Sequence, residues 1–298
     1  MQMDYKLLRA LDAVVVSQSF DRAASLLSIT QSAVSQRIRQ LEQHWGEPLL
    51  VRAQPLQLTA LGQQLIGHYR RVSQLEQQLQ EQLEPDSKKP MPFPLAVNAD
   101  SLAIWLLDAL SKPLRLGDIE LHLTVENEAQ TWQRMQSGEV LGCITNREKP
   151  VSGAVSIPLG VLTYLCVASP AFIKRYFDEE RISIQQLRQA PAIAFDQRDD
   201  MHFQFIESLF GLKPGEYPCH TVRSSETFVS MTESGYAYCM IARQQVPIQL
   251  EQGRLINLFP EHSIRVPLYW HYWLFSGSIM EQLSGMIVQY SQSILDLL

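Results

Sequence analysis

The chain has 298 residues, of which 46% are hydrophobic and 19% charged, and it carries a formal net charge of -6. This composition excludes a disordered chain and a membrane-spanning one, and the length suffices for two or three domains. The four cysteines show no C-x-x-C spacing, so the sequence predicts thiols rather than a zinc cluster or a disulfide framework. The most apolar run near the start, residues 13–16, is too short for a secretory leader, so we expect a cytoplasmic protein.

Charge is distributed unevenly along the chain. Residues 1–71 contain eight basic and five acidic side chains, a balance of +3, whereas the remainder carries 17 basic and 26 acidic ones, a balance of -9. A basic N-terminal part joined to an acidic remainder favours a small DNA-binding module attached to another domain.

In chain order, the apolar spacing predicts a first helix around residues 7–15, a short second helix over 21–27, and a third that Thr30 caps and that runs to about residue 43. The apolar positions of the third helix follow the spacing of a buried stripe: Val34, Ile38, Leu41 and Trp45. Its opposite side carries hydrogen-bonding groups: Ser32, Gln36, Arg39, Gln40 and Gln43, flanked by Ser35 and Arg37.

This polar face is suited to reading DNA. Glutamine pairs bidentately with adenine, arginine pairs with guanine, and serine reaches either a base or the backbone. We therefore predict a helix-turn-helix whose third helix enters the major groove of double-stranded DNA. A solvated amphipathic helix is the alternative, although such a helix more often carries glutamate.

Two further elements follow the third helix. The stretch EPLLVRAQPLQLT, residues 47–59, predicts a β wing whose Arg52 contacts a phosphate. A long helix is then predicted from Thr59 to Glu84, and every seventh residue of it is apolar at Leu65, Val72 and Leu79. We expect this stripe to pair with a second copy in a dimer, and packing against its own domain is the alternative. The candidate DNA-binding residues are Thr30, Gln31, Ser32, Ser35, Gln36, Arg37, Arg39 and Arg52.

Proline marks the end of the long helix and the start of a different pattern. Pro85 ends the helix, and prolines at 90, 92 and 94 predict an extended hinge. Beyond the hinge, strand-like runs alternate with helix-like runs, which predicts an α/β region with a mostly parallel sheet in two lobes. The sequence holds no Gly-rich phosphate loop, G-x-S-x-G elbow or H-E-x-x-H, so we expect no cofactor, no metal and no enzymatic activity.

Residues 19–52, SFDRAASLLSITQSAVSQRIRQLEQHWGEPLLVR, resemble the signature of LysR-type transcriptional regulators. The stretches TQSAVSQRI, NADSLAIWLL, FDQRDDMH and SSETFV are similar to the ArgP/LysG branch of that family, which senses lysine or arginine. The sequence departs from the common family pattern at Ser32, Gln36 and Leu50, where proline, arginine and an aromatic residue are more usual. The operator sequence of relatives therefore cannot be carried over.

The resemblance implies an α/β architecture with an N-terminal all-α winged helix-turn-helix (residues 1–58), a long dimerising linker helix with its hinge (59–91), and a two-lobed periplasmic-binding-protein-like effector domain (92–298). Lobe I is expected at about 92–160 and 267–298, and lobe II at about 161–266. The resemblance implies a homodimer or tetramer on promoter DNA, with RNA polymerase a further candidate partner and no membrane association. A nucleoid-type protein that acts on DNA architecture or replication initiation without an effector is the second interpretation, and an enzyme is the third.

The resemblance places the effector between the lobes, where strand ends supply the candidates because open parallel sheets bind ligands beyond their carboxyl ends. These candidates are Asn98, Asp100, Ser101, Glu126, Glu128, Thr145, Asp196, Asp199, Asp200 and His202. The many carboxylates predict a cationic amino acid, lysine or arginine, whose α-carboxylate would meet the helix start at Asp100. Glu126 and Asp196 are the first choices for the side-chain cation, because they end strands of opposite lobes and bridging them would close the cleft.

Two histidines and the solvated acidic rim have simpler interpretations. For any single carboxylate, a solvated position on the rim is the alternative to a ligand contact. His202 is a candidate ligand contact or pH-sensitive partner for Asp199, but a lone histidine beside carboxylates is more often a surface or helix-capping group. The run YWHYW, residues 269–273, predicts an inner strand of lobe I with His271 satisfied locally rather than an aromatic cage.

Overall fold

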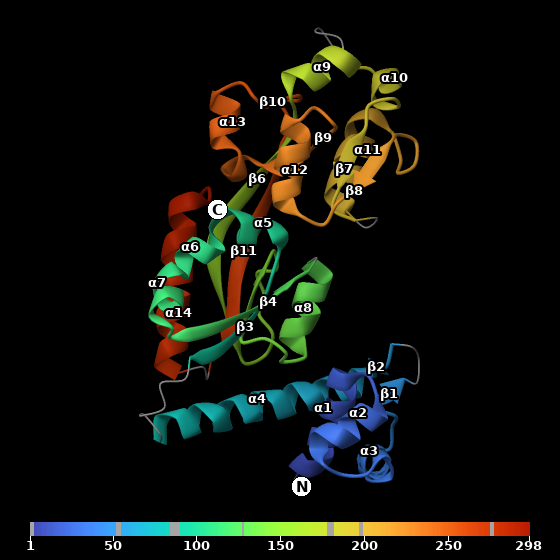
Figure 1. Cartoon of the computed structure of the whole chain (residues 1–298), viewed down its shortest axis with the longest axis vertical. Coiled ribbons are helices and arrows are strands. Elements are labelled where there is room, and N and C mark those ends of the chain that lie inside the picture. Colours follow the sequence, from blue (N-terminus) through green and yellow to red (C-terminus); the bar gives the residue numbers. More distant parts are fainter. Residues whose placement is uncertain are drawn as a thin grey trace.

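The computed structural model describes residues 3–51, 55–83, 90–126, 128–177, 182–196, 199–274 and 277–298. A helical head lies at one end, a long helix leads away from it, and a two-lobed α/β body lies beyond that helix (Figure 1). Among the described helices, none is both long enough and apolar enough to cross a membrane. All four cysteines are in the thiol form, as predicted.

The head is formed by α1 (Tyr5–Ser17), α2 (Phe20–Leu27) and α3 (Gln31–Trp45). Each helix begins at a side-chain cap: Asp4, Ser19 and Thr30 accept from backbone amides of the following turn. The predicted stripe of α3 is buried against the other helices, and Val34 is fully inaccessible. These local signals lie within a few residues of the helices that they specify, so the three predicted helices are confirmed.

The predicted wing is confirmed as a short hairpin. Strand β1 (Leu50–Val51) pairs antiparallel with β2 (Gln57–Leu58), and Thr59 caps the following helix α4 (Ala60–Leu83) by accepting from the Gly62 amide at 3.1 Å. A Cβ at Gly62 would lie 2.3 Å from the Leu49 carbonyl oxygen, so only glycine lets α4 start this close to the wing. Arg52, predicted to contact a phosphate, lies outside the described residues.

The predicted apolar stripe of α4, with one apolar residue at every seventh position, does not form a single interface. Leu65 is 4% exposed and packs in the head core beside Ile66, so its assignment to an intermolecular seam is wrong. The alternative interpretation, packing against the helix's own domain, holds for this first half of α4. In the second half, Leu75, Leu79 and Leu83 are 40%, 56% and 72% exposed, which leaves an apolar surface there.

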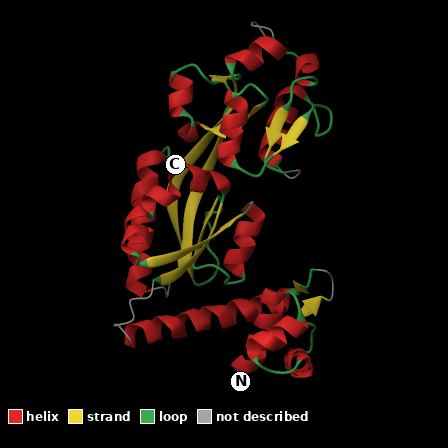
Figure 2. Ribbon diagram, viewed as in Figure 1, coloured by secondary structure: helices red, strands yellow, loops and turns green. Residues whose placement is uncertain are grey.

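The body is built on one sheet of strand order β4-β3-β5-β11-β6-β9-β7-β8, with β10 paired to β6. The strands are β3 (Met91–Val97), β4 (Ile119–Val125), β5 (Gly142–Thr145), β6 (Ala154–Ala168), β7 (Ala192–Ala194), β8 (Cys219–Thr221), β9 (Tyr238–Ala242), β10 (Ile256–Asn257) and β11 (Ile264–Trp273). We refer to the part around β3, β4 and β5 as lobe I and to the part around β7, β8 and β9 as lobe II. Strands β6 and β11 run through both lobes (Figure 2).

Pairing is parallel only inside each lobe. Strand β3 is parallel to β4 and β5, and β7 is parallel to β8 and β9. The crossing strands β6 and β11 are antiparallel to each other and to their neighbours β9 and β5. The prediction of a mostly parallel sheet is therefore wrong at the centre, because the chain passes between the lobes once in each direction. Pro92 and Pro94, predicted as hinge, lie in β3.

Helices cover both faces of the sheet (Figure 1). The helical segments of lobe I are α5 (Ala99–Ser101), a π-helical turn (Leu102–Leu106), α6 (Leu107–Ala109), α7 (Ser111–Leu116), α8 (Glu128–Gln136) and α14 (Gly277–Ile294). Those of lobe II are α9 (Pro170–Tyr176), α10 (Ile184–Leu187), α11 (Asp200–Phe210), α12 (Ser225–Glu233), a 3-10 turn (Arg243–Gln245) and α13 (Pro247–Glu251). The lobe limits expected near residues 160 and 267 fall inside β6 and β11 and stay a prediction.

Candidate functional site

Helix α3 lies on the side of the head that is away from the body (Figure 1), and the polar side chains of α3 are at the surface of the head. Gln31, Ser32, Gln36 and Arg39 are exposed, while Ser35 and Arg37 are half-buried on the flanks. Thr30 has a structural role as well, since its hydroxyl accepts from the Ala33 amide at 3.2 Å and pairs with Ser32 at 2.9 Å. The face is therefore free to enter a groove, and its base and phosphate contacts stay predictions.

A cavity of about 130 Å³ lies between the two lobes of the body. Lobe I contributes the start of α5 and the residue after β4, and lobe II contributes the end of β7 and the start of α11 and α12. The lining residues are Asn98, Ala99, Asp100, Glu126, Tyr164, Ile193, Phe195, Asp199, Met201, Ser225, Phe228, Met240, Ile241 and Gln245. This position, beyond the carboxyl ends of parallel strands, is the one predicted for a ligand.

Asp100 links the two lobes across the cavity. The Tyr164 hydroxyl donates to one of its carboxylate oxygens at 2.5 Å, and the Ser225 hydroxyl lies 2.6 Å from the other. Ser225 also lies 2.9 Å from Oε1 of Gln245. Burial, the charge of Asp100 and the hydrogen bond to it raise the pKa of Tyr164 well above its ordinary value. Tyr164 therefore stays a neutral donor that holds Asp100 in place.

Two more carboxylates border the cavity. Glu126, one residue beyond β4, accepts from Arg134 at 2.9 Å. Asp199 caps α11, and its oxygens accept from the amides of Phe195 at 2.8 Å and His202 at 3.3 Å. Burial raises the pKa of Asp199, the two amide hydrogen bonds oppose this rise, and the charges of Asp100 and Asp196 add to it. Among the described lining residues none is lysine or arginine, so the cavity is negative and favours a cation.

Asn98 provides a further ligand-facing group. It precedes α5, it lines the cavity, and its side-chain oxygen is buried without a hydrogen-bond partner in the described part of the chain. Such an oxygen carries a desolvation cost unless a donor meets it. A ligand with N–H groups would supply that donor.

The structure brings together four of the ten predicted effector residues: Asn98, Asp100, Glu126 and Asp199. Ser101 and Thr145 are 0% and 1% exposed and do not line the cavity, so the prediction that they face the cleft is wrong. Asp200 is exposed on the first turn of α11, away from the cavity lining. The side chain of Glu128 lies outside the described part of the structure.

Asp196 does not face the cavity either. Its carboxylate lies 3.2 Å from Arg223, and the residue is absent from the described lining. The expectation that Glu126 and Asp196 bridge the lobes is therefore wrong for Asp196. Glu126 lines the cavity as expected, and the carboxylate from lobe II is Asp199 instead.

His202 is neither a ligand contact nor a surface group. It is 1% exposed, and its ring packs against Phe203, Tyr217 and Tyr238 at centroid distances of 5.7, 5.9 and 5.8 Å. Burial lowers its pKa to about 4. The predicted roles of His202 as a ligand contact, as a pH-sensitive partner for Asp199 and as a surface or helix-capping group are wrong, since neither ring nitrogen has a hydrogen-bond partner in the described part of the chain. The acidic residues before it in sequence carry no information about the aromatic residues that cover it.

The inner-strand position predicted for His271 is confirmed, but the ring is satisfied at Nε2 alone, because Nδ1 is buried without a hydrogen-bond partner in the described part of the chain. His271 lies on β11 between β5 and β6, is 0% exposed, and its Nε2 is 3.1 Å from the Ser156 hydroxyl and 2.7 Å from the Arg147 carbonyl oxygen. Burial lowers its pKa, and the hydrogen bond to Arg147 opposes this. His271 is thus a structural residue of an inner strand.

Three residues that line the cavity were not predicted from the sequence: Tyr164, Ser225 and Gln245. Tyr164 lies in the middle of an apolar strand, and nothing in its neighbours marks it as a donor to a carboxylate. Ser225 opens α12 in the stretch SSETFV, where a helix start rich in hydroxyl groups was an available signal. Gln245 lies in a single 3-10 turn and had no such signal.

Known protein families match the chain in two parts, which correspond to the head and to the body. Residues 5–63 match the family described as "Bacterial regulatory helix-turn-helix protein, lysR family", and residues 95–276 match "LysR substrate binding domain". The chain belongs to the LysR family. The first LysR match spans α1 to the start of α4, and the second contains every residue that lines the cavity.

Individual relatives within the LysR family are similar over nearly the whole chain. The regulator ArgP of Aeromonas salmonicida is 50% identical over 287 residues, 96% of each chain, and that of Salmonella typhi is 44% identical over 292 residues, 98% of each. The crystal structure of ArgP from Mycobacterium tuberculosis is 29% identical with a TM-score of 0.83 and covers 100% of both chains. LysG from Corynebacterium glutamicum, solved with bound effector Arg, is 28% identical with a TM-score of 0.80, over 99% of this chain and 100% of that one.

Proposed function

We propose that this LysR-family protein is a DNA-binding transcriptional regulator whose promoter binding is modulated by lysine or arginine in the cavity between the lobes. The relatives named ArgP and the arginine-bound LysG support this class of ligand. We further propose that it acts in the cytoplasm as a homodimer or tetramer, with RNA polymerase as a further partner, and that it has no enzymatic activity.

The observation that carries the proposal is the charge of the cavity. Asp100, Glu126 and Asp199 converge on it from both lobes, and the unpaired oxygen of Asn98 adds a fourth acceptor. A guanidinium or ammonium group offers several N–H donors and a positive charge, which are the partners that partly buried carboxylates need. A neutral or anionic ligand would leave Asp100 and Asp199 without a cationic partner in the described lining, at a free-energy cost.

The position of these acceptors also gives the ligand an effect on conformation. Asp100 and Glu126 belong to lobe I, and Asp199 belongs to lobe II, so a cation between them binds best when the lobes are closed. A ligand shifts an equilibrium only by its differential affinity for the two states, and such a bridge provides it. A nucleoid-type protein without an effector would have no use for this arrangement.

Calorimetric titration of the full chain with lysine and arginine tests the proposal. We expect Glu126→Gln to weaken binding about 10- to 100-fold, because a hydrogen bond to a charged group contributes about 1.5–3 kcal/mol. Glu120→Gln is the matched control, because Glu120 lies on the strand that leads to Glu126 but its side chain is 60% exposed and does not line the cavity. Equal loss in both variants, or no loss in either, would contradict the proposed site.

A further inference from the structure

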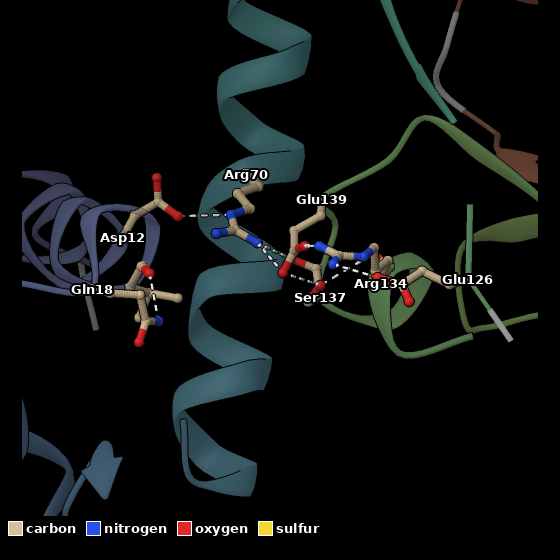
Figure 3. Close-up of polar contacts among 8 residues, drawn as sticks. Asp12, Gln18, Arg70, Glu126, Arg134, Ser137 and Glu139 are labelled. Atoms are coloured by element: carbon tan, nitrogen blue, oxygen red, sulfur yellow. Dashed lines mark hydrogen bonds and ion pairs between the residues drawn. The ribbon is translucent and has the colours of Figure 1, made fainter. Parts of the chain in front are cut away.

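A series of ion pairs connects the effector cavity with the DNA-binding head (Figure 3). Asp12 of α1 lies 2.7 Å from Nε of Arg70 on α4, and Nη1 of Arg70 lies 3.1 Å from Oε1 of Glu139. The other oxygen of Glu139 lies 2.6 Å from Nη1 of Arg134 on α8, whose Nη2 lies 2.9 Å from Glu126. Alternating charges therefore join the head, the linker helix and lobe I.

The backbones of α4 and lobe I meet closely at the same place. A Cβ on Gly67 would lie 3.0 Å from the Gln136 carbonyl oxygen, and one on Gly138 would lie 3.1 Å from the Gly67 carbonyl oxygen. Gly138 has φ +65°, a conformation that favours glycine. Arg70 also donates to the Ser137 carbonyl oxygen at 3.4 Å. Lobe I thus rests on α4 through the turn after α8, and Arg70 and Glu139 hold that contact.

Within this series, Glu126 is shared with the effector cavity. It also borders the groove between the wing and α8, to which Gln57, Leu58 and Gln133 contribute. Its side chain is 24% exposed, so its charge is screened less than that of a surface carboxylate. A change in the pairing partner of Glu126 therefore affects both the cavity and the groove beside the head.

Glu139 and Arg134 stay charged at neutral pH. Burial would raise the pKa of Glu139, but Arg70, Ser137 and Arg134 together hold it below the ordinary value. Burial would lower the pKa of Arg134, but its contacts with Glu126 and Glu139 raise it overall. Neither group changes its protonation near neutrality, so the pairing changes only if another charge enters the series.

We propose that Glu126 couples effector binding to the contact between lobe I and the linker helix. The proposal rests on the proposed function for the class of ligand, a cationic amino acid. Three carboxylates pair with two guanidinium groups: Asp12, Glu139 and Glu126 with Arg70 and Arg134. A ligand cation that pairs with Glu126 withdraws one carboxylate.

The remaining charges then pair within each body. Arg134 keeps Glu139, Arg70 keeps Asp12, and the pair between Arg70 and Glu139, which crosses from α4 to lobe I, is the one that weakens. The head and linker helix are released from lobe I, which changes how the heads of a dimer can be spaced on DNA. Coupling of this kind runs through a contiguous chain of charged contacts with two discrete pairings.

Hydrogen–deuterium exchange of the full chain, with and without saturating arginine, tests the coupling. In the wild type, arginine lowers protection of residues 66–71 and 137–139 by about 5- to 20-fold, within the usual range of coupling between sites. The Glu126→Gln substitution lowers this protection in the absence of ligand. In Arg70→Gln and Glu139→Gln, arginine causes no further loss of protection. Arg254→Gln is the control: it removes a 2.6 Å ion pair with Glu233 in lobe II and keeps the wild-type response.

Calorimetry on the same samples separates this inference from the proposed function. If neither arginine nor lysine binds the wild type, both the proposed function and the coupling are wrong. If arginine binds but protection at residues 66–71 and 137–139 does not change, the coupling is wrong and the proposed function stands. The same conclusion follows if Arg70→Gln responds to arginine as the wild type does.

Discussion

His202 makes the stability of lobe II depend on pH in a direction that its burial determines. Its pKa is about 4 in the folded chain and 6.5 in an ordinary setting. Below pH 6.5 the unfolded chain takes up a proton at this residue, whereas the folded chain does so only near pH 4. The free energy of unfolding is therefore not reduced by His202 above pH 6.5, and it decreases as the pH falls from 6.5 towards 4.

The size of the effect follows from linkage. One pKa unit corresponds to about 1.4 kcal/mol, so the free energy of unfolding falls by about 2 kcal/mol at pH 5 and by about 3 kcal/mol near pH 4. Asp199 acts in the opposite direction, because its pKa is raised in the folded chain. Comparison of variants at one pH at a time separates the two residues.

Urea unfolding at pH 7.5, 6.5, 5.5 and 5.0 measures the effect in the wild type and in His202→Phe. Phenylalanine suits a site lined by Phe203, Tyr217 and Tyr238, and we expect the variant to lose about 2 kcal/mol less than the wild type between pH 7.5 and 5. His220→Gln, at an exposed position on β8, serves as the control and keeps the wild-type profile. Identical profiles for the wild type and His202→Phe would refute the buried neutral histidine.

Three shorter predictions concern DNA reading, assembly and the core. Gln36→Ala relaxes sequence preference by about 1–3 kcal/mol per base pair read, measured by fluorescence anisotropy on a panel of operator variants; an unchanged preference would remove Gln36 from the groove. Leu79→Asp with Leu83→Asp, both on the exposed half of α4, breaks the dimer in sedimentation while the lobes stay folded, and an intact dimer would place the interface elsewhere. Gly142→Ala costs about 1–3 kcal/mol of stability in urea unfolding, because a Cβ there would lie 2.3 Å from the Trp270 ring, and a neutral effect would contradict this packing.

Local signals made the head predictable from sequence. The Thr30 cap, the apolar stripe of α3 and the two apolar runs of the wing act over a few residues, so spacing alone specifies them. The sequence misplaced Leu65 because a heptad stripe looks the same whether it faces a second copy or the helix's own head. Only the packing of α4 against α1 and α3 decides between them.

The cavity was predictable in its position but not in its details. Strand ends pointed to Asn98, Asp100 and Glu126 because the carboxyl ends of parallel strands meet at one edge. The partners of Asp100 could not be found this way, since Ser225 is 125 residues away in sequence and Tyr164 is 64 residues away. Such contacts depend on how β6 crosses between the lobes, and no local pattern encodes that crossing.

The central claim is that the cavity recognises the positive charge of an amino-acid side chain. Calorimetric titration of the wild-type chain with lysine and norleucine tests it most directly, because norleucine differs from lysine only by lacking the terminal ammonium group. We predict that lysine binds and that norleucine binds at least about tenfold more weakly, the loss expected when buried carboxylates keep no charged partner. Equal affinity for lysine and norleucine would contradict the claim.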